Sequence, residues 1–336
     1  MVGPYIIAEI GQAHDGSLGM AHSYIDAMAN QGVNAIKFQT HIAEAESSEF
    51  EKFRIKFSYQ DKTRYDYWQR MEFSLDDWKG LKDHCSQNEI DFISTPSCLA
   101  AVDLLEKVGV CKYKIGSGDY DNYLLLEKVL KTKKPIILST GMSIISEIDD
   151  LVKYILRNGS DLTLMQCTTS YPTTIEQWGL NVIPQMKNRY DVKIGFSDHS
   201  GNVNACIAAA ALGTDVFEFH VVFHKEQFGP DTSSSILIDD VHYLVQGIRD
   251  VTNAINNPYD KNNLSKSMKN QRDIFGKSIA INRNVKKGHI ITINDLESKK
   301  PGGMGILAKD YKKVLGKSIN KDLRKWSFIK ENDIEK

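Results

Sequence analysis

Two histidines in the second half of the chain could hold a metal ion together. His199 stands in Gly195-Phe-Ser-Asp-His-Ser200 and His220 in Phe217-Glu-Phe-His220, and each follows a short apolar run. If these runs are neighbouring parallel strands, the two imidazoles meet at one end of the sheet, where a divalent cation can bridge them. Nitrogen and oxygen ligands without clustered thiolates favour Mn²⁺ or Mg²⁺ over structural zinc. The alternative for each histidine is a buried ring that is satisfied by its neighbours.

Two lysines lie inside otherwise apolar runs. Lys37 is in Ala35-Ile-Lys-Phe38, and Lys114 is in Tyr113-Lys-Ile115. A buried cation is unfavourable unless it reaches an anion, so the pair predicts an anionic substrate. Lys114-Ile-Gly-Ser-Gly-Asp119 also offers a hydroxyl group and backbone donors that suit phosphate oxygens. The alternative is that each lysine extends along the surface to the rim of the fold.

Further polar residues stand where the apolar runs end. Glu9 could exchange a proton with substrate or bind a hydroxyl group, or it could form a salt bridge with Lys37. Asp231 follows a Gly-Pro turn and could point inward, or it could cap that turn. The candidate residues at the run ends are Glu9, Lys37, Gln39, Thr95, Lys114, Ser117, Asp119, Ser139, Thr169, Tyr171, Ser197, His199 and His220.

The elements that must position these residues alternate between two patterns. Short β-branched runs are separated by longer stretches of helical period, as in βα units around a parallel sheet. Eight such units in about 255 residues predict a (β/α)8 TIM barrel, an α/β fold whose functional groups gather at the carboxyl ends of its strands. The predicted strands are residues 5–8, 35–38, 91–94, 113–115, 135–139, 162–166, 193–196 and 216–220.

Two segments depart from this alternation. Residues 40–72 form a polar, aromatic-rich insertion after the second strand, which could be a wall or lid at the active-site face or a loop that packs on a partner. Residues 257–274 are predicted to be a linker after a barrel of residues 1–256, since their start is rich in Asn, Lys and Ser. Residues 275–336 then form a small β-rich module, with strands expected at 278–281 and 327–329.

Composition excludes several classes of protein. The 336 residues include 42 basic and 43 acidic side chains, so no nucleic-acid partner is indicated. No apolar stretch approaches the roughly 18 residues of a membrane-spanning helix, and the start lacks the features of a signal peptide. We therefore expect a cytoplasmic protein. The five cysteines are scattered, without a CxxC pair, and are expected to be reduced thiols.

Several motifs in order resemble the sialic acid synthase family, which includes N-acetylneuraminate, legionaminate and pseudaminate synthases and relatives in spore-coat polysaccharide synthesis. The end of the chain is similar to the antifreeze-like SAF domain attached to these enzymes, in Phe275-Gly-Lys-Ser-Ile, Lys300-Pro-Gly and Val314-Leu-Gly-Lys. The barrel motifs are Ile7-Ala-Glu-Ile-Gly, His14-Asp-Gly16, Ala35-Ile-Lys-Phe-Gln-Thr40, Lys114-Ile-Gly-Ser-Gly, Leu138-Ser-Thr-Gly-Met142, Cys167-Thr, Tyr171-Pro172, Gly195-Phe-Ser-Asp-His-Ser200 and Gly229-Pro-Asp231.

This resemblance implies condensation of phosphoenolpyruvate with the open-chain aldehyde of an N-acyl hexosamine, with release of phosphate by C–O cleavage. By position, His199 and His220 would hold the metal, and Glu9 would be the acid/base residue. Lys114, Ser117, Ser139 and Ser197 would bind the phosphate of phosphoenolpyruvate, while Lys37, Gln39 and Thr95 would orient its carboxylate. Asp119, Tyr171 and Asp231 would contact the sugar. A homodimer is implied, in which each terminal domain caps the barrel mouth of its partner.

The chain departs from the family pattern mainly on the sugar side. Thr169 replaces a frequent asparagine and Asp119 a frequent glutamate. Lys300 occupies the place of an arginine thought to reach a partner's acyl group, and a lysine cannot reproduce the guanidinium fork. Ala13 and Asp15 also replace the two asparagines usual around the first histidine. These differences lie among the residues expected to bind the acceptor sugar and argue against N-acetylmannosamine itself. The residues expected to bind phosphoenolpyruvate match the family pattern.

Three hypotheses follow. The first is a phosphoenolpyruvate-dependent nonulosonate synthase. The second is a related synthase that takes a different sugar, phosphorylated or not acetylated, in surface or spore-coat polysaccharide synthesis. The third is a catalytically silent barrel that binds carbohydrate through its terminal domain.

Overall fold

The computed structural model describes residues 3–335. The chain folds as two compact units, Met1–Asn257 and Pro258–Lys336. Within the described residues, no helix combines the length and the apolar character that crossing a bilayer requires.

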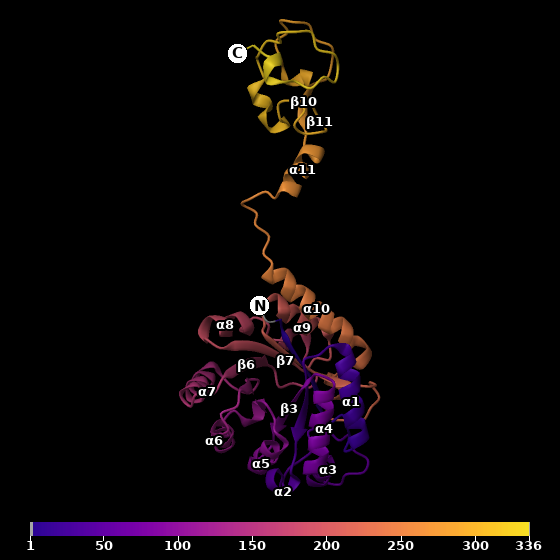
Figure 1. The fold of residues 1–336 in the computed structure, drawn as a ribbon, viewed down its shortest axis with the longest axis vertical. Coiled ribbons are helices and arrows are strands. Elements are labelled where there is room, and N and C mark those ends of the chain that lie inside the picture. Colours follow the sequence, from indigo (N-terminus) through magenta and orange to yellow (C-terminus); the bar gives the residue numbers. More distant parts are fainter. Residues whose placement is uncertain (1–2, 336) are drawn as a thin grey trace. The chain divides into compact units, whose positions relative to one another are not determined.

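The first unit is a closed barrel of parallel strands with helices around it (Figure 1). Strands β1 to β8 pair in chain order, and β8 pairs with β1 to complete the ring. The predicted (β/α)8 fold is therefore confirmed, and each predicted strand is present. The strands are β1 Tyr5–Gly11, β2 Ala35–Thr40, β3 Asp91–Pro96, β4 Tyr113–Ile115, β5 Ile136–Ser139, β6 Leu162–Cys167, β7 Lys193–Asp198 and β8 Val216–Val222.

The helices lie on the outside of the strands and bury one apolar face each against them. Local sequence sets where they begin and end: Ser74 and Asp77 form a capping box at the start of α4, and Gly109 ends α5 in the left-handed conformation. The helices around the barrel are α1 Leu18–Gln31, α4 Leu75–Gln87, α5 Leu99–Val108, α6 Tyr123–Lys131, α7 Ile145–Arg157, α8 Val182–Arg189, α9 Val203–Ala211 and α10 Ile238–Asn256.

Helix α8 was not predicted from the sequence. It has only 8 residues, includes Pro184 and is polar over much of its length, so it lacks a clear helical period. Ile183 and Met186 are its buried residues and attach it to the barrel. A short strand β9, Ile236–Leu237, also continues from β8 by parallel pairing.

The interior of the barrel changes from apolar to polar within two residues along its strands. An inner apolar cluster consists of Ile7, Ala35, Ile93, Ile137, Met165 and Val216. Side chains two positions apart on a strand point to the same face. The next inward positions are therefore Glu9, Lys37, Thr95, Ser139, Cys167 and Glu218, which form the base of a polar cavity above an apolar floor.

The insertion after β2 is ordered by aromatic packing. It contains α2, Ala43–Glu46, and α3, Arg64–Met71. Tyr67, Trp68 and Met71 of α3 are buried together with Ala43, and Phe53 and Phe57 pack against them. This cluster gives the insertion a core of its own beside the strand ends.

The second unit holds helix α11, Lys266–Phe275, and an antiparallel pair, β10 Ser278–Ile281 and β11 Leu296–Lys299. All of helix α11 except its last residue lies within residues 257–274, which were predicted to be a linker. The strand expected at 278–281 is present, whereas residues 327–329 form only an isolated bridge, between Phe328 and Ala280. A small core that includes Ile279, Ile281 and Ile329 holds this unit together.

Candidate active site

A cavity of about 510 Å³ opens at the carboxyl ends of the barrel strands. A site of this size accommodates two small substrates side by side. Nearly all candidate residues from the sequence line it: Glu9, Lys37, Gln39, Thr95, Lys114, Ser117, Asp119, Ser139, Thr169, Tyr171, Ser197, His199 and His220. The two exceptions are Asp231 and Lys300.

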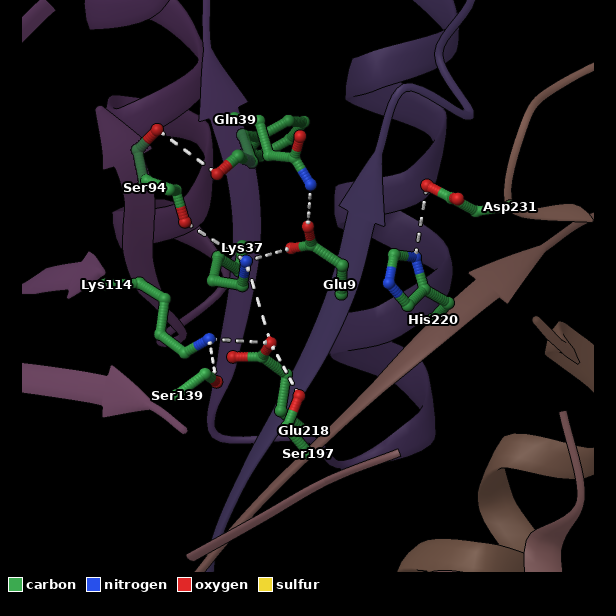
Figure 2. Close-up of polar contacts among 12 residues, drawn as sticks. Glu9, Lys37, Gln39, Ser94, Lys114, Ser139, Ser197, Glu218, His220 and Asp231 are labelled. Atoms are coloured by element: carbon green, nitrogen blue, oxygen red, sulfur yellow. Dashed lines mark hydrogen bonds and ion pairs between the residues drawn. The ribbon is translucent and has the colours of Figure 1, made fainter. Parts of the chain in front are cut away.

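Two lysines and two glutamates form a buried ionic network at the base of the cavity. Figure 2 shows Lys37 between Glu9 and Glu218, with Lys114 beyond Glu218. Lys37 Nζ lies 2.9 Å from Glu9 Oε2 and 3.7 Å from Glu218 Oε1, and Lys114 Nζ lies 3.2 Å from the same Glu218 oxygen. All four side chains are at most 4% exposed. Both lysines thus reach into the barrel rather than to its rim, and Glu9 forms the salt bridge that was its alternative prediction.

The ionisation of this network follows from its pairing. Burial alone would lower the pKa of Lys37, but Glu218 and Glu9 outweigh it and raise that pKa above its usual value. Burial would likewise raise the pKa of Glu218, but Lys114 and Lys37 outweigh it and lower that pKa. The two glutamates thus favour the ammonium form of Lys37, and the two lysines favour the carboxylate form of Glu218. Oxygen Oε2 of Glu218 still has no hydrogen-bond partner among residues 3–335.

Glu218 is the main site residue that the sequence analysis missed. It lies inside the apolar run Val216–Val222, where a lone carboxylate is as unusual as Lys37 or Lys114 in theirs. The alternation of β8 was a usable signal, because His220 and Glu218 stand two positions apart and must share the inward face.

Hydroxyl and amide groups surround the ammonium groups. Lys114 Nζ donates to Ser139 Oγ at 2.7 Å, and Lys37 Nζ lies 3.3 Å from Thr95 Oγ1. Ser197 donates to Glu218 at 3.2 Å, and Gln39 donates to Glu9 at 2.7 Å. These side chains come from β2, β3, β5 and β7, and the closed ring of strands brings them together.

Gly141 lets the loops after β4, β5 and β6 approach one another. Its backbone N–H donates to Ser117 Oγ at 3.0 Å. A Cβ atom at this position would lie 2.4 Å from Thr169 Oγ1 and 3.1 Å from Cys167 Sγ, so any side chain would displace the Thr169 hydroxyl. The absence of a side chain lets Ser117 and Thr169 line the same cavity in their present positions.

His199 and His220 lie side by side, with ring centroids 5.3 Å apart. Nδ1 of His199 lies 2.9 Å from the carbonyl oxygen of Thr168, which fixes the ring and leaves Nε2 facing Tyr171 Oη at 3.2 Å. Burial lowers the pKa of both histidines, so the rings are neutral and can act as metal ligands. The ring of Tyr171 stacks on His199 at 4.2 Å.

The two histidines are suited to a metal that takes its remaining ligands from elsewhere. Among residues 3–335, no group of three or more His, Cys, Asp or Glu side chains is arranged to hold an ion. Two neutral imidazoles could supply the protein ligands of a metal site that is open to substrate. The second ring nitrogen of one of them is bonded to a backbone carbonyl, as is usual for a histidine ligand. Substrate oxygens and water would have to supply the rest.

Asp231 lies beside the cavity rather than in its lining. Its Oδ1 accepts from Arg54 at 2.7 Å, and its Oδ2 lies 4.0 Å from Nδ1 of His220. The guanidinium group of Arg54 also sits 4.4 Å from the ring centre of Tyr171. Lys300 belongs to the second unit, where its ammonium group lies 5.4 Å from the ring centre of Phe275.

The insertion after β2 supplies a wall of the cavity. His41, Glu46, Glu51 and Trp68 line it, and none of them was predicted as a site residue. His41 stacks on Trp68 at 3.8 Å and lies 2.7 Å from Glu46, while Trp68 Nε1 donates to both oxygens of Glu51 at 3.1 Å. The prediction of a wall or lid at the active-site face is thus confirmed as a wall.

Comparison with known proteins agrees with this architecture. The chain matches the NeuB family over residues 24–259 and the SAF domain over residues 276–335. N,N'-diacetyllegionaminic acid synthase of Campylobacter jejuni is 33% identical over 332 residues, which cover 97% of this chain and 98% of that protein. A pseudaminic acid synthase of Campylobacter jejuni is 31% identical over 335 residues, which cover 98% and 96%.

A solved structure shows the same fold. The N-acetylneuraminic acid synthetase of Leptospira borgpetersenii, crystallised with citrate, superimposes with a TM-score of 0.71 at 28% identity and covers 80% of this chain and 90% of that one. The family match spans most of the barrel, and the relatives that match over nearly the whole chain are named as synthases of nonulosonic acids. The chain belongs to the NeuB family of synthases and carries a C-terminal SAF domain.

Proposed function

We propose that this protein condenses phosphoenolpyruvate with the aldehyde of an N-acyl hexosamine to form a nonulosonic acid, with release of phosphate. One observation carries the proposal: two buried ammonium groups and two neutral imidazoles line the same cavity. The ammonium groups suit an anionic substrate, and the imidazoles suit a divalent cation beside it.

The lysine end of the cavity would receive phosphoenolpyruvate. Lys114, with Ser117, Ser139 and Ser197 nearby, would bind the phosphate group. Lys37, Gln39 and Thr95 would orient the carboxylate. The lysines are paired with carboxylates in this structure, so the substrate's anionic groups would share cations that are already charged and fixed in place, at little cost of reorganisation.

His199 and His220 would hold a divalent cation, Mn²⁺ or Mg²⁺. When bound, the cation would act as a Lewis acid on the carbonyl oxygen of the acceptor. Tyr171 packs on one ring and lies near the other, which would keep both imidazoles in position. Tyr171, Thr169, Asp119 and Asp231 would contact the sugar.

The reaction would proceed in two stages at phosphoenolpyruvate. Carbon three of the enol ether attacks the aldehyde carbon, which forms the new C–C bond and leaves positive charge at carbon two. Water then adds to carbon two, and the C–O bond to phosphate breaks in the resulting tetrahedral intermediate. Glu9, which is held between Lys37 and Gln39, would exchange protons with the water and the sugar oxygen. Lys114 would stabilise the departing phosphate.

The terminal domain would complete the site in a homodimer. In this proposal the barrel comprises residues 1–256, the linker residues 257–274 and the SAF domain residues 275–336, and Lys300 would reach the sugar of the partner subunit's site. Two features support this role of Lys300. Its side chain is exposed before a Pro-Gly turn, and the domain that carries it has its own small core.

The reaction is tested by coupling phosphate release to product analysis. With phosphoenolpyruvate, Mn²⁺ and an N-acyl hexosamine, the enzyme should release phosphate and form a product whose mass equals the sum of pyruvate and the sugar. Sugar binding without any consumption of phosphoenolpyruvate would instead support the silent, carbohydrate-binding barrel.

The metal assignment predicts the behaviour of His220→Ala. Loss of one of two protein ligands should lower metal-dependent turnover by at least about 100-fold, since even partners that only orient a ligand contribute about 10–100-fold. Activity is measured across a Mn²⁺ titration. His242→Ala, at an exposed position of α10, is the matched control and should behave as the wild type. Full activity of His220→Ala would remove this metal site from the proposal.

The phosphate role predicts the behaviour of Lys114→Met. The KM for phosphoenolpyruvate should rise by at least about tenfold, because a charge-assisted hydrogen bond to the phosphate is lost. Lys112→Met is the control: Lys112 precedes the same strand but pairs with Asp91 at 2.9 Å, and it does not line the cavity. Thermal unfolding of both variants is measured to distinguish a loss of stability from a loss of substrate binding. An unchanged KM in folded Lys114→Met would contradict the assignment.

The dimer proposal predicts the effect of deleting residues 275–336. The barrel has its own large core, so it should remain folded by circular dichroism, while turnover should fall by at least about tenfold because the site is no longer capped. Sedimentation of the full-length protein should give the mass of a dimer. Normal turnover of the truncated barrel, or a monomeric full-length protein, would refute the capping.

A further inference from the structure

A line of hydrogen bonds runs from the insertion after β2 into the barrel and ends at Glu9. Its three outer residues are Glu46, His41 and Gln12, and Gln39 connects them to Glu9. We infer that the three outer residues are positioning residues: they fix the orientation of the Gln39 amide, and that amide in turn holds the carboxylate of Glu9. This inference rests on the proposed function, in which Glu9 exchanges protons with the water and the sugar.

The inner end of the line sets the direction of its hydrogen bonds. Figure 2 shows the amide nitrogen of Gln39 facing Glu9, and this nitrogen donates to Glu9 Oε1 at 2.7 Å. A carboxylate that is paired with an ammonium group, as Glu9 is with Lys37, accepts hydrogen bonds. Gln39 must therefore present its nitrogen to Glu9 and its oxygen to the other side. That oxygen accepts from Nε2 of Gln12.

The outer end requires the same direction. Nδ1 of His41 lies 2.7 Å from Oε1 of Glu46, and the backbone N–H of Ile42 donates to Oε2 of Glu46 at 3.3 Å. Burial would raise the pKa of Glu46, but the hydrogen bonds from His41 and Ile42 help to outweigh it, and that pKa is lowered. The carboxylate is thus an acceptor, so Nδ1 of His41 carries the proton. A neutral ring then offers its Nε2 as an acceptor.

Gln12 joins the two ends because its amide nitrogen carries two hydrogens. Nε2 of Gln12 lies 3.4 Å from Nε2 of His41 and also donates to Oε1 of Gln39. One hydrogen can go to each acceptor, so both contacts are satisfied at once. The opposite orientation of this amide would place its oxygen against the oxygen of Gln39. Each member of the line therefore has one orientation that suits both of its neighbours.

Packing keeps the outer residues in place. The ring of His41 stacks on Trp68, with centroids 3.8 Å apart and an interplanar angle of 18°. His41 is 7% exposed and Gln12 is 6% exposed, so water has little access to their polar atoms. A buried donor that faces another donor loses its hydration without compensation. A reversal at one member would therefore be passed along the line to Glu9.

The test reverses the line without changing its shape, through Glu46→Gln. The backbone N–H of Ile42 needs an oxygen, which leaves the nitrogen of the new amide facing Nδ1 of His41. The ring must then carry its proton on Nε2, which opposes the amide nitrogen of Gln12. In phosphate release with phosphoenolpyruvate, Mn²⁺ and an N-acyl hexosamine, we expect kcat to fall by about 10- to 100-fold, since a small misplacement of a reacting group has effects of this order.

A second substitution separates the direction of the line from structural damage. His41→Phe keeps an aromatic ring beside Trp68 but has no ring nitrogen, so in combination with Glu46→Gln it removes the misplaced donor. The double variant should have a kcat at least about threefold above that of Glu46→Gln alone, because residues in one hydrogen-bond network are coupled. Two independent losses of stability would not produce this rescue.

Glu44→Gln is the matched control, since Glu44 is exposed on the same short helix α2 and should be replaceable without effect. Thermal unfolding identifies which variants are folded at the assay temperature. A kcat equal to that of the wild type in folded Glu46→Gln, or a further fall in the double variant, would overturn the inference.

The position of the proton on His41 is measured independently of turnover. In ¹⁵N NMR spectra of histidine-labelled protein at about pH 8, where histidine is usually neutral, the proton should be on Nδ1 in the wild type and on Nε2 in Glu46→Gln. The signal is assigned by its absence in His41→Phe. The same tautomer in both proteins would overturn the inference even if no product forms. The expected tautomers without any product from the wild type would count against the proposed reaction alone.

Discussion

The site depends on the pairing of two ammonium groups with two carboxylates inside the barrel. An isolated buried charge costs several kcal/mol, and the attraction between oppositely charged partners offsets this only when the geometry is good. Here Glu218 lies between Lys37 and Lys114, and Glu9 lies on the other side of Lys37, so neither lysine is alone. Removing one partner would leave an uncompensated charge in the centre of the fold and destabilise it by about 3–5 kcal/mol.

This network explains why polar residues that are far apart in the sequence must meet. Glu9, Lys37 and Glu218 each follow an apolar inward residue two positions earlier, so on β1, β2 and β8 the floor of the barrel and the base of the site are set by the same alternation. Lys114 on β4 is the exception, because Lys112 stands two positions before it. The closed strand order brings β1, β2, β4 and β8 around one space. His220 stands two positions after Glu218 on β8, and His199 directly follows the end of β7.

The sequence was sufficient for the strands, because eight β-branched runs with polar residues at their ends are a strong periodic signal. It also identified Lys37 and Lys114, since charged residues inside apolar runs are conspicuous. It was not sufficient for Glu218. In the same apolar run, only His220 was recognised as a candidate site residue. Glu46, Glu51 and Trp68 lie in an irregular insertion without a period, so nothing in their spacing indicated that they face the cavity. Helix α8 was too short and too polar to be recognised.

The two ends of the cavity are built in different ways. The residues of the ionic network come from barrel strands, where a change in one residue disturbs the packing of its neighbours. Another part of the lining comes from one contiguous insertion, Thr40 to Glu72, which has an aromatic core of its own. Substitutions within this insertion can therefore reshape its part of the cavity while the strand residues that form the ionic network keep their positions.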